Sequence, residues 1–173
     1  MKSLSYIFLL LVSFILVCCK NEKSVKQDCT LGKPTAIFTD SMEFIKQHTF
    51  NVKDQESAES LILPDDVTLQ IDQAGCESIS QRYTFTYPTQ LKLDSISVAV
   101  DSVISKFNYL STKNNKLKAF SLWSNALTQY KSQLHQNEQL ELDNGIMISI
   151  DKMNSFNRTS LYFECLQKGL SEE

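Results

Sequence analysis

Histidine is the side chain most often used as a general acid or base at neutral pH, and the chain has two. His48 and His135 both lie in polar stretches, and neither has another His or a Cys at the spacing of a metal site. We therefore expect both imidazoles to be solvated surface groups. The sequence predicts no metal site and no catalytic histidine.

Carboxylates are the other groups that could carry chemistry. Asp65-Asp66 and Asp143-Asn144 bring oxygen ligands together, but calcium needs six or more oxygens in a set order, so turn formation explains both pairs better. With four glycines and no Gly-x-Ser-x-Gly motif, the chain lacks a phosphate-binding loop and a serine-hydrolase elbow, and we expect no cofactor. Two carboxylates distant in sequence can still hydrolyse glycosides, and that alternative stays open.

A short apolar run opens the chain. Lys2 provides a positive start, the run covers residues 6–17, and Lys20 ends it. This length is typical of a signal peptide, whereas a membrane-spanning helix needs ~20 apolar residues. Leu16-Val17-Cys18-Cys19 resembles the bacterial lipobox, although Cys18 stands where that motif usually has Gly, Ala or Ser.

The resemblance to bacterial lipoproteins implies that residues 1–18 are a cleaved signal peptide and that Cys19 carries several acyl chains. Two or more such chains give durable anchoring, and the polar residues 20–28 are typical of a flexible tether. An ordinary secretory signal and an uncleaved anchor are the alternatives.

Three features of the chain also resemble lipoproteins of one bacterial group. The Cys18-Cys19-Lys20 junction, the Lys/Asn/Ser/Ile-rich composition and the segment 73–77 are similar to small lipoproteins of the Bacteroidota, which bring no known activity. This similarity implies a lipid-anchored protein of the cell envelope, at the outer membrane on its periplasmic or surface side.

Export places the remaining thiols in oxidising conditions, where a disulfide can form. Beyond Cys19 these thiols are Cys29, Cys76 and Cys165. Cys76 and Cys165 each adjoin a predicted strand, which favours this pair, and the two pairs with Cys29 remain alternatives. There is no Cys-x-x-Cys motif to support a metal site.

Residues 29–173 suffice for a single domain with a real core. The formal net charge is −3, the only arginines are Arg82 and Arg158, and the charges are dispersed. Such a surface lacks the positive footprint of a nucleic-acid-binding protein. The expected partners are the membrane, through the lipid, and a protein of the envelope.

Alternation of apolar and polar residues predicts strands in two parts of the chain. Three antiparallel strands are predicted between Leu61 and Tyr87, with Pro64-Asp65-Asp66 as the first turn. Asn144-Gly145 predicts a hairpin with a type I′ turn. The further predicted strands cover residues 140–142, 146–150 and 161–165.

A spacing of three and four between apolar residues predicts two helices, over residues 94–110 with Asp94 as N-cap and over 117–134. A short helix is expected over Met42–Gln47 and a loop over 53–60. The fold class predicted is α+β: two layers, with an antiparallel sheet of about six strands and two central helices packed on one face.

One face of such a sheet stays open to water, and Arg82, Met147 and Tyr162 are expected there as a weak binding site. Because no catalytic set is found, the function predicted is a non-enzymatic binding or interaction module. An edge strand would offer strand addition as a binding mode. The alternative is an envelope hydrolase whose carboxylates lie far apart in sequence.

Overall fold

The computed structural model describes residues 33–75 and 78–167, so the predicted signal peptide, Cys19 and the tether lie outside the described residues. No helix within this range is long and apolar enough to cross a membrane. The strands are β1 (Gln47–Lys53), β2 (Glu56–Ile62), β3 (Thr68–Gly75), β4 (Ile79–Tyr87), β5 (Gln139–Glu141), β6 (Ile146–Ser155) and β7 (Arg158–Gln167). The helices are α2 (Ile96–Ser111) and α3 (Phe120–Tyr130), with short 3₁₀ turns at Asn115–Leu117 and Lys131–Gln133.

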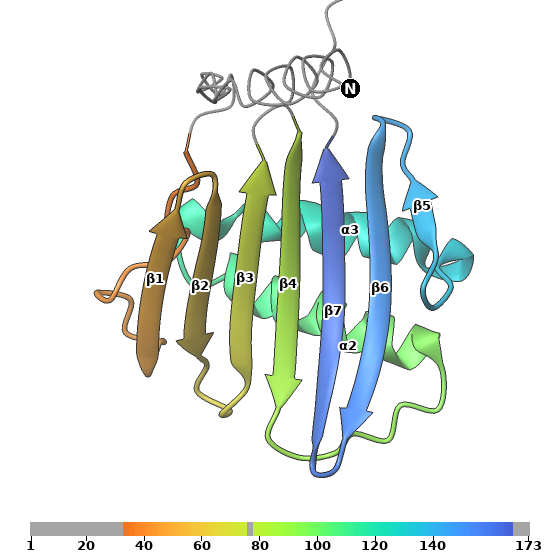
Figure 1. Ribbon diagram of the computed structural model, residues 1–173. Coiled ribbons are helices and arrows are strands. Elements are labelled where there is room, and N and C mark those ends of the chain that lie inside the picture. The colour runs from red at the N-terminus through yellow and green to blue at the C-terminus, as the bar shows by residue number, and fades with distance from the viewer. Residues whose placement is uncertain (1–32, 76–77, 168–173) are drawn as a thin grey trace, which may run out of the picture.

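The seven strands form one antiparallel sheet in the order β1-β2-β3-β4-β7-β6-β5 (Figure 1). With two helices beside this sheet, the fold is α+β, as the sequence predicted. The sheet has one strand more than the expected six. The additional strand is β1.

Two local predictions at the start of the domain were wrong. The expected helix over Met42–Gln47 is absent, and in its place Met42 and Ile45 donate to Thr39 and Met42 carbonyls in tight turns. The expected loop over residues 53–60 is mostly β2. The sequence gives little alternation here because β1 is an edge strand whose face is largely exposed, so pairing with β2 decides its conformation.

The hairpin between β5 and β6 is present, but its turn differs from the predicted type I′. Gly145 has φ of 75°, whereas Asn144 is not among the described residues with positive φ. Leu142 N–H donates to Ile146 C=O at 2.8 Å, and Gly145 N–H donates to Leu142 C=O at 2.9 Å. The connection is therefore a three-residue loop with glycine in the left-handed position.

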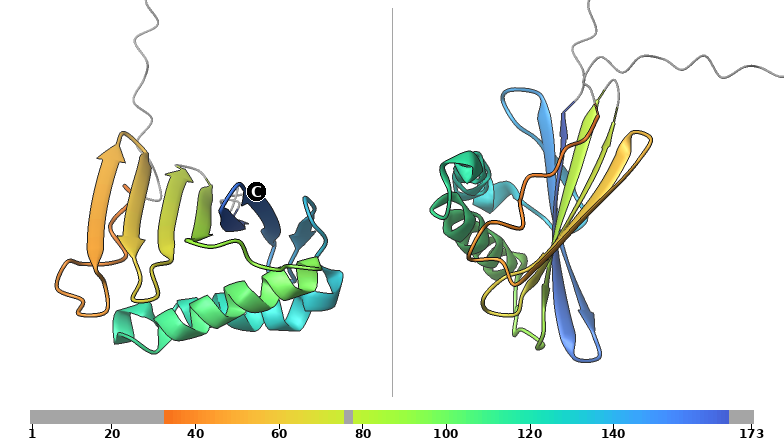
Figure 2. Two further views of the ribbon diagram at one scale, coloured as in Figure 1. Left: turned by 90° about the horizontal axis from the view of Figure 1, so that it is seen from below. Right: turned by 90° about the vertical axis from the view of Figure 1, so that its left-hand side faces the viewer.

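The two faces of the sheet differ in burial. Leu69, Phe85 and Leu161 are neighbours across β3, β4 and β7, and all three are fully buried. The residues next to them in each strand are exposed or half-buried. We call the buried face the inner face and the other the open face. Figure 2 shows α2 and α3 side by side along the inner face.

Helix α2 begins one residue later than predicted, because Ser95 rather than Asp94 is its N-cap and Ser95 Oγ accepts from Val98 N–H. Its buried residues Val100, Val103 and Phe107 recur at a spacing of three and four. Helix α3 is shorter than the predicted segment, since 3₁₀ turns take up its two ends.

Phe107 is the centre of an aromatic core between the helices and the sheet. Its ring centroid lies 5.4 Å from Tyr83, 5.5 Å from Phe85, 5.6 Å from Phe120 and 5.2 Å from Phe163. Aromatic pairs at these separations contribute beyond the area they bury. One side chain of α2 thus connects α3 to β4 and β7.

Residues 33–46 pass on the same side of the sheet as the helices and continue that layer over β1 and β2 (Figure 2). Phe38 is fully buried and stacks on Phe120, with ring centroids 5.8 Å apart. Phe44 contacts Phe38 edge to face at 6.4 Å. This segment belongs to the folded core.

Candidate functional site

The open face carries rows of polar side chains that run from strand to strand. One row consists of the cross-strand neighbours Asn51, Ala58, Asp72, Arg82 and Glu164. Charges of opposite sign stand next to one another in this row. The adjacent row consists of Lys53, Glu56, Ala74 and Ser80.

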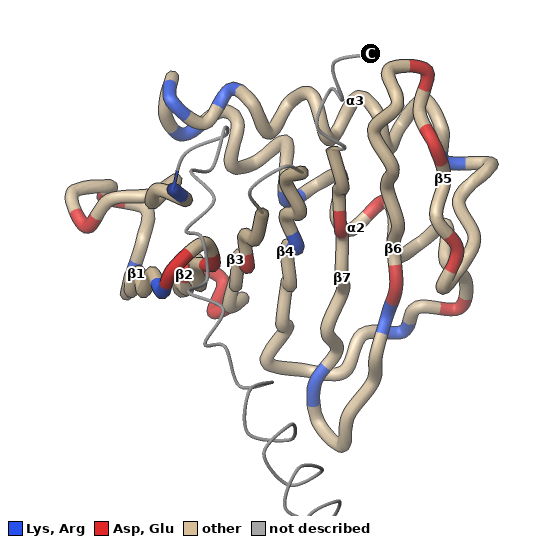
Figure 3. Tube along the Cα trace, turned by 45° about the horizontal axis from the view of Figure 1, so that its top comes forward, with Lys and Arg blue, Asp and Glu red and all other residues tan. Residues whose placement is uncertain are grey.

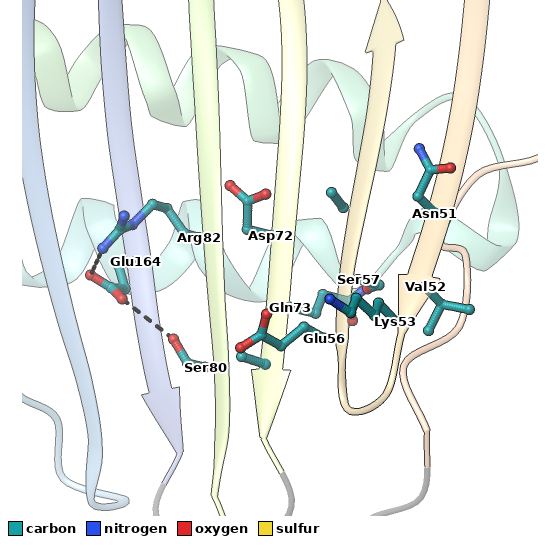
Figure 4. A pocket seen from close by; sticks show the side chains of 12 residues that line it. Asn51, Val52, Lys53, Glu56, Ser57, Asp72, Gln73, Ser80, Arg82 and Glu164 are labelled. Atoms are coloured by element: carbon teal, nitrogen blue, oxygen red, sulfur yellow. Dashed lines mark hydrogen bonds and ion pairs between the residues drawn. The ribbon is translucent and has the colours of Figure 1, made fainter.

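A hollow of about 440 Å³ lies over these two rows (Figure 4). The small side chains of Ala58 and Ala74 leave the space. Figure 4 shows Arg82 and Glu164 on one side of the hollow and Lys53 on the other. Its lining comprises Asn51, Val52, Lys53, Glu56, Ser57, Ala58, Asp72, Gln73, Ala74, Ser80, Arg82 and Glu164.

Charges of both signs face this hollow. An Arg82 guanidinium nitrogen lies 3.2 Å from Glu164 Oε2, and Ser80 Oγ donates to Glu164 Oε1 at 3.3 Å. Within the described part of the chain, no ion pair is seen for Lys53 or Glu56. These two charged groups remain available to a polar ligand or to the surface of another protein.

The three predicted binding residues all lie on the open face, and the structure brings two of them close. Arg82 lines the hollow. Tyr162 pairs with Thr84, so it is a diagonal neighbour of Arg82 across β4 and β7. Met147 lies on β6, two strands from Arg82 in the sheet, and does not line the hollow.

The hollow residues of the β1–β2 hairpin were not predicted from the sequence. Asn51, Lys53 and Glu56 fell in segments predicted to be a loop or left unassigned. The alternation of Ser57, Glu59 and Leu61 with exposed or half-buried neighbours is the pattern that reveals β2. This alternation was not recognised in the sequence because a charged residue, Glu59, occupies an inward-facing position.

His48 is not the solvated surface residue that we expected. Its side chain is 9% exposed and lies between two carboxylates. Nδ1 is 2.7 Å from Asp40 Oδ1, and Nε2 is 2.8 Å from Glu59 Oε1. A neutral imidazole has a single N–H, so both hydrogen bonds form only when His48 is protonated. We call Asp40, His48 and Glu59 the carboxylate–histidine cluster.

Glu59 is fully buried and connects this cluster to the N-terminal segment. Its Oε1 accepts from Phe38 N–H at 2.8 Å, and its Oε2 accepts from Ile37 N–H at 2.9 Å. Burial opposes the charge on His48, but hydrogen bonds to Asp40 and Glu59 outweigh it and raise the His48 pKa above 6.5. The pairing therefore stabilises the fold fully below pH 6.5 and loses this contribution as pH rises through the folded-state pKa.

The cluster holds the fold together and offers little for catalysis. Both ring nitrogens of His48 face carboxylates, so neither is available to accept a proton from a substrate. Across residues 33–75 and 78–167, no group of three or more His, Cys, Asp and Glu is placed to hold a metal ion. His135 is exposed, as expected. The hollow on the open face is therefore the candidate functional site.

Cys165 is a buried thiol on the inner face. Its Sγ lies 3.9 Å from Gln81 Oε1, and burial raises the pKa of the thiol to about 12. Almost none of it is thiolate at neutral pH, so it is unreactive as a nucleophile. Cys29 and Cys76 lie outside the described residues, and the Cys76–Cys165 disulfide stays a prediction.

Comparison of the chain with protein-family models, curated proteins and solved structures gave no match.

Proposed function

We propose that the protein is a lipoprotein of the cell envelope, anchored through acyl chains on Cys19, which binds a partner without catalysing a reaction. The binding surface is the open face of the sheet. In this proposal the fold has two layers, with both helices packed on the inner face. The observation that carries it is the hollow of about 440 Å³ over β1–β4 and β7, in which Lys53 and Glu56 present charges of both signs.

The alternative function, hydrolysis by dispersed carboxylates, would use Glu56, Asp72 or Glu164, which all line the hollow. Glycoside hydrolysis requires one carboxyl group that is held protonated to act as the acid. Arg82 and Ser80 both donate to Glu164, and Gln70 donates to both oxygens of Asp72 at 2.9 and 3.0 Å. Two of the three carboxylates are therefore already engaged by side chains of the sheet and do not form a free pair around a substrate, so binding is the better supported function.

The anchor has a direct test. We expect the mature protein purified from membranes to begin at Cys19 and to carry acyl mass on that residue, because Leu16-Val17-Cys18-Cys19 resembles a lipobox. Mass spectrometry of the intact protein measures both features. We expect a Cys19→Ser variant to lose them. An intact Met1, or a terminus at residue 19 without acyl mass, would overturn this part of the proposal.

The hollow is tested by filling it. Ala74→Trp places an indole in the hollow, and we expect it to reduce recovery of the bound partner from solubilised membranes at least tenfold. Thr68→Trp is the matched control, since Thr68 lies on the open face of the same strand but does not line the hollow. The measurement is stoichiometric co-purification, followed by identification of the partner by mass spectrometry.

Two outcomes would contradict the proposed binding site. One is equal partner recovery by Ala74→Trp and Thr68→Trp at unchanged thermal stability. The other is that no protein is recovered while the purified protein hydrolyses an envelope glycan and Glu164→Gln abolishes that activity. The second result would support the hydrolase.

A further inference from the structure

The two edges of the sheet differ in length. β5 forms one edge with three residues, and β1 forms the other with seven. A long exposed edge presents unpaired backbone groups and is a ready template for another strand unless charge or a covering segment protects it. Residues 33–46 pass on the side of the inner face (Figure 2), and within the described chain no hydrogen bond joins them to the backbone of β1. The one charged side chain in β1 besides His48 is Lys53 at its end.

The hydrogen bonds of β2 show which backbone groups of β1 point outward. Leu63 N–H donates to Val67 C=O, and Gly75 N–H donates to Gln55 C=O. The backbone N–H and C=O groups of the odd-numbered residues of β2 therefore point toward β3. The backbone groups of its even-numbered residues therefore point toward β1, where they pair with those of the odd-numbered residues from Gln47 to Lys53. The N–H and C=O groups of His48, Phe50 and Val52 consequently point away from the sheet.

These six outward groups have no partner within the described chain. No backbone hydrogen bond outside the helices and strands involves His48, Phe50 or Val52, and no side chain in the described ranges bonds to their backbone. Their spacing is that of the hydrogen-bonding edge of an antiparallel strand, along which every second residue exchanges two hydrogen bonds with the opposite strand.

We propose that β1 pairs antiparallel with β1 of a second copy of this chain, with the two-fold axis beside Phe50. In this register Phe50 exchanges two hydrogen bonds with the Phe50 of the second copy. His48 does the same with Val52 of the second copy, and Val52 with His48. All outward groups of both strands are then satisfied, and a shift of two residues in either direction would leave some unpaired.

The side chains suit this register. On the inner face the two Phe50 rings meet, and Val52, which is 51% exposed, gains a neighbour. On the open face Thr49 lies opposite Asn51, and Lys53 lies opposite Gln47, so no like charges face each other. The same register sets Lys46, whose Nζ lies 2.6 Å from Asp66 Oδ1 in its own chain, across from Asp54 in the β1–β2 turn of the other copy, so opposite charges also meet at both ends of the pairing.

The pairing would join two open faces into one continuous surface of fourteen strands, seven from each copy. An interface of one strand pair is smaller than a standard stable protein interface, so we expect a dimer that dissociates on dilution. This inference is independent of what the hollow binds, and it holds whether or not Cys19 carries lipid.

Cysteine cross-linking tests the register in the full-length protein. Phe50→Cys places two thiols in a directly opposed pair, where the Cα separation of ~5.5 Å suits a disulfide. Val52→Cys is the matched control: its side chain is on the same face, but the two substituted positions are offset by four residues, ~13 Å along the strand. We expect mild oxidation to give at least tenfold more dimer cross-linked at position 50 than at position 52, identified by mass spectrometry of the linked peptides.

A second variant tests the hydrogen bonds themselves. Phe50→Pro removes an outward N–H and no β1–β2 hydrogen bond, so the hairpin tolerates it as an edge position. Sedimentation of the detergent-solubilised protein is expected to show a concentration-dependent dimer for wild type and at least tenfold weaker association for Phe50→Pro. A wild-type protein that stays monomeric at high concentration, or equal cross-linking at positions 50 and 52, would overturn the proposal. So would a photo-cross-linker at position 50 that captures only a different protein.

Discussion

Replacing Glu59 with alanine is expected to lower the free energy of unfolding by about 3–5 kcal/mol, the range typical of removing one partner from a buried ionic pair. The buried carboxylate accepts hydrogen bonds from Ile37 N–H, Phe38 N–H and His48. Its removal leaves two backbone donors without a partner in the core and takes away one of the two charges that hold protonated His48.

Urea denaturation at pH 6 measures this loss. Glu56→Ala is the control, because Glu56 is an exposed glutamate on the same strand and should change stability little. The deficit of Glu59→Ala should shrink as pH rises through the folded-state pKa of His48, since wild type then loses the same pairing. If Glu59→Ala lowered the free energy of unfolding by less than about 1 kcal/mol at pH 6, the carboxylate–histidine cluster would not be what holds residues 33–46 on the sheet.

Phe107→Ala is expected to cost about 3–5 kcal/mol of unfolding free energy, as is usual for removing a buried phenylalanine ring. The ring is fully buried, and its centroid lies 5.6 Å from that of Phe120 and 5.2 Å from that of Phe163. Its loss opens a cavity between α2, α3 and the sheet that these rigid neighbours cannot fill.

Phe156→Ala provides the contrast for this prediction. Phe156 is 97% exposed at the tip of the β6–β7 hairpin, so its removal should change stability by less than about 0.5 kcal/mol. Thermal and urea unfolding of both variants measure the difference. Similar losses for the two would mean that the aromatic core does not centre on Phe107.

The central strands were predictable because burial of one face imposes strict alternation on them. Leu69 and Ile71 in β3, and Tyr83 and Phe85 in β4, are buried every second residue. The helices were predictable for a similar reason, since Val100, Val103 and Phe107 form one buried side of α2. In both elements the core acts directly on the residues that form the pattern.

β1 and the carboxylate–histidine cluster were not predictable, because their structure depends on groups distant in sequence. Glu59 and His48 occupy inward positions that alternation assigns to apolar residues. Their burial is compensated by Asp40 and the backbone of residues 37–38, and nothing in the local sequence indicates these partners. The part of the hollow that the β1–β2 hairpin lines was not predicted, for the same reason.

Figure 3 shows that acidic and basic residues are scattered over the strands and helices. The sheet as a whole carries residues of both signs, and so does helix α2, so long-range attraction of a highly charged partner is weak. In the binding function that we propose, recognition at the hollow then depends on short-range fit to particular groups such as Arg82 and Lys53. The sequence predicted this dispersal, since its charged residues form no long run of one sign.

The path of residues 33–46 has a mechanical consequence. Tension applied at the N-terminal end of this segment reaches the sheet first at Thr35, whose C=O accepts from Gln73 on β3, and then at Ile37 and Phe38, whose N–H groups donate to Glu59 on β2. The Phe38 ring also packs against Phe120. The load therefore enters β3, β2 and the core before it reaches β1. A pulling force on this segment therefore has to break several buried contacts together, whereas a chain that entered directly at β1 would separate the sheet one residue pair at a time.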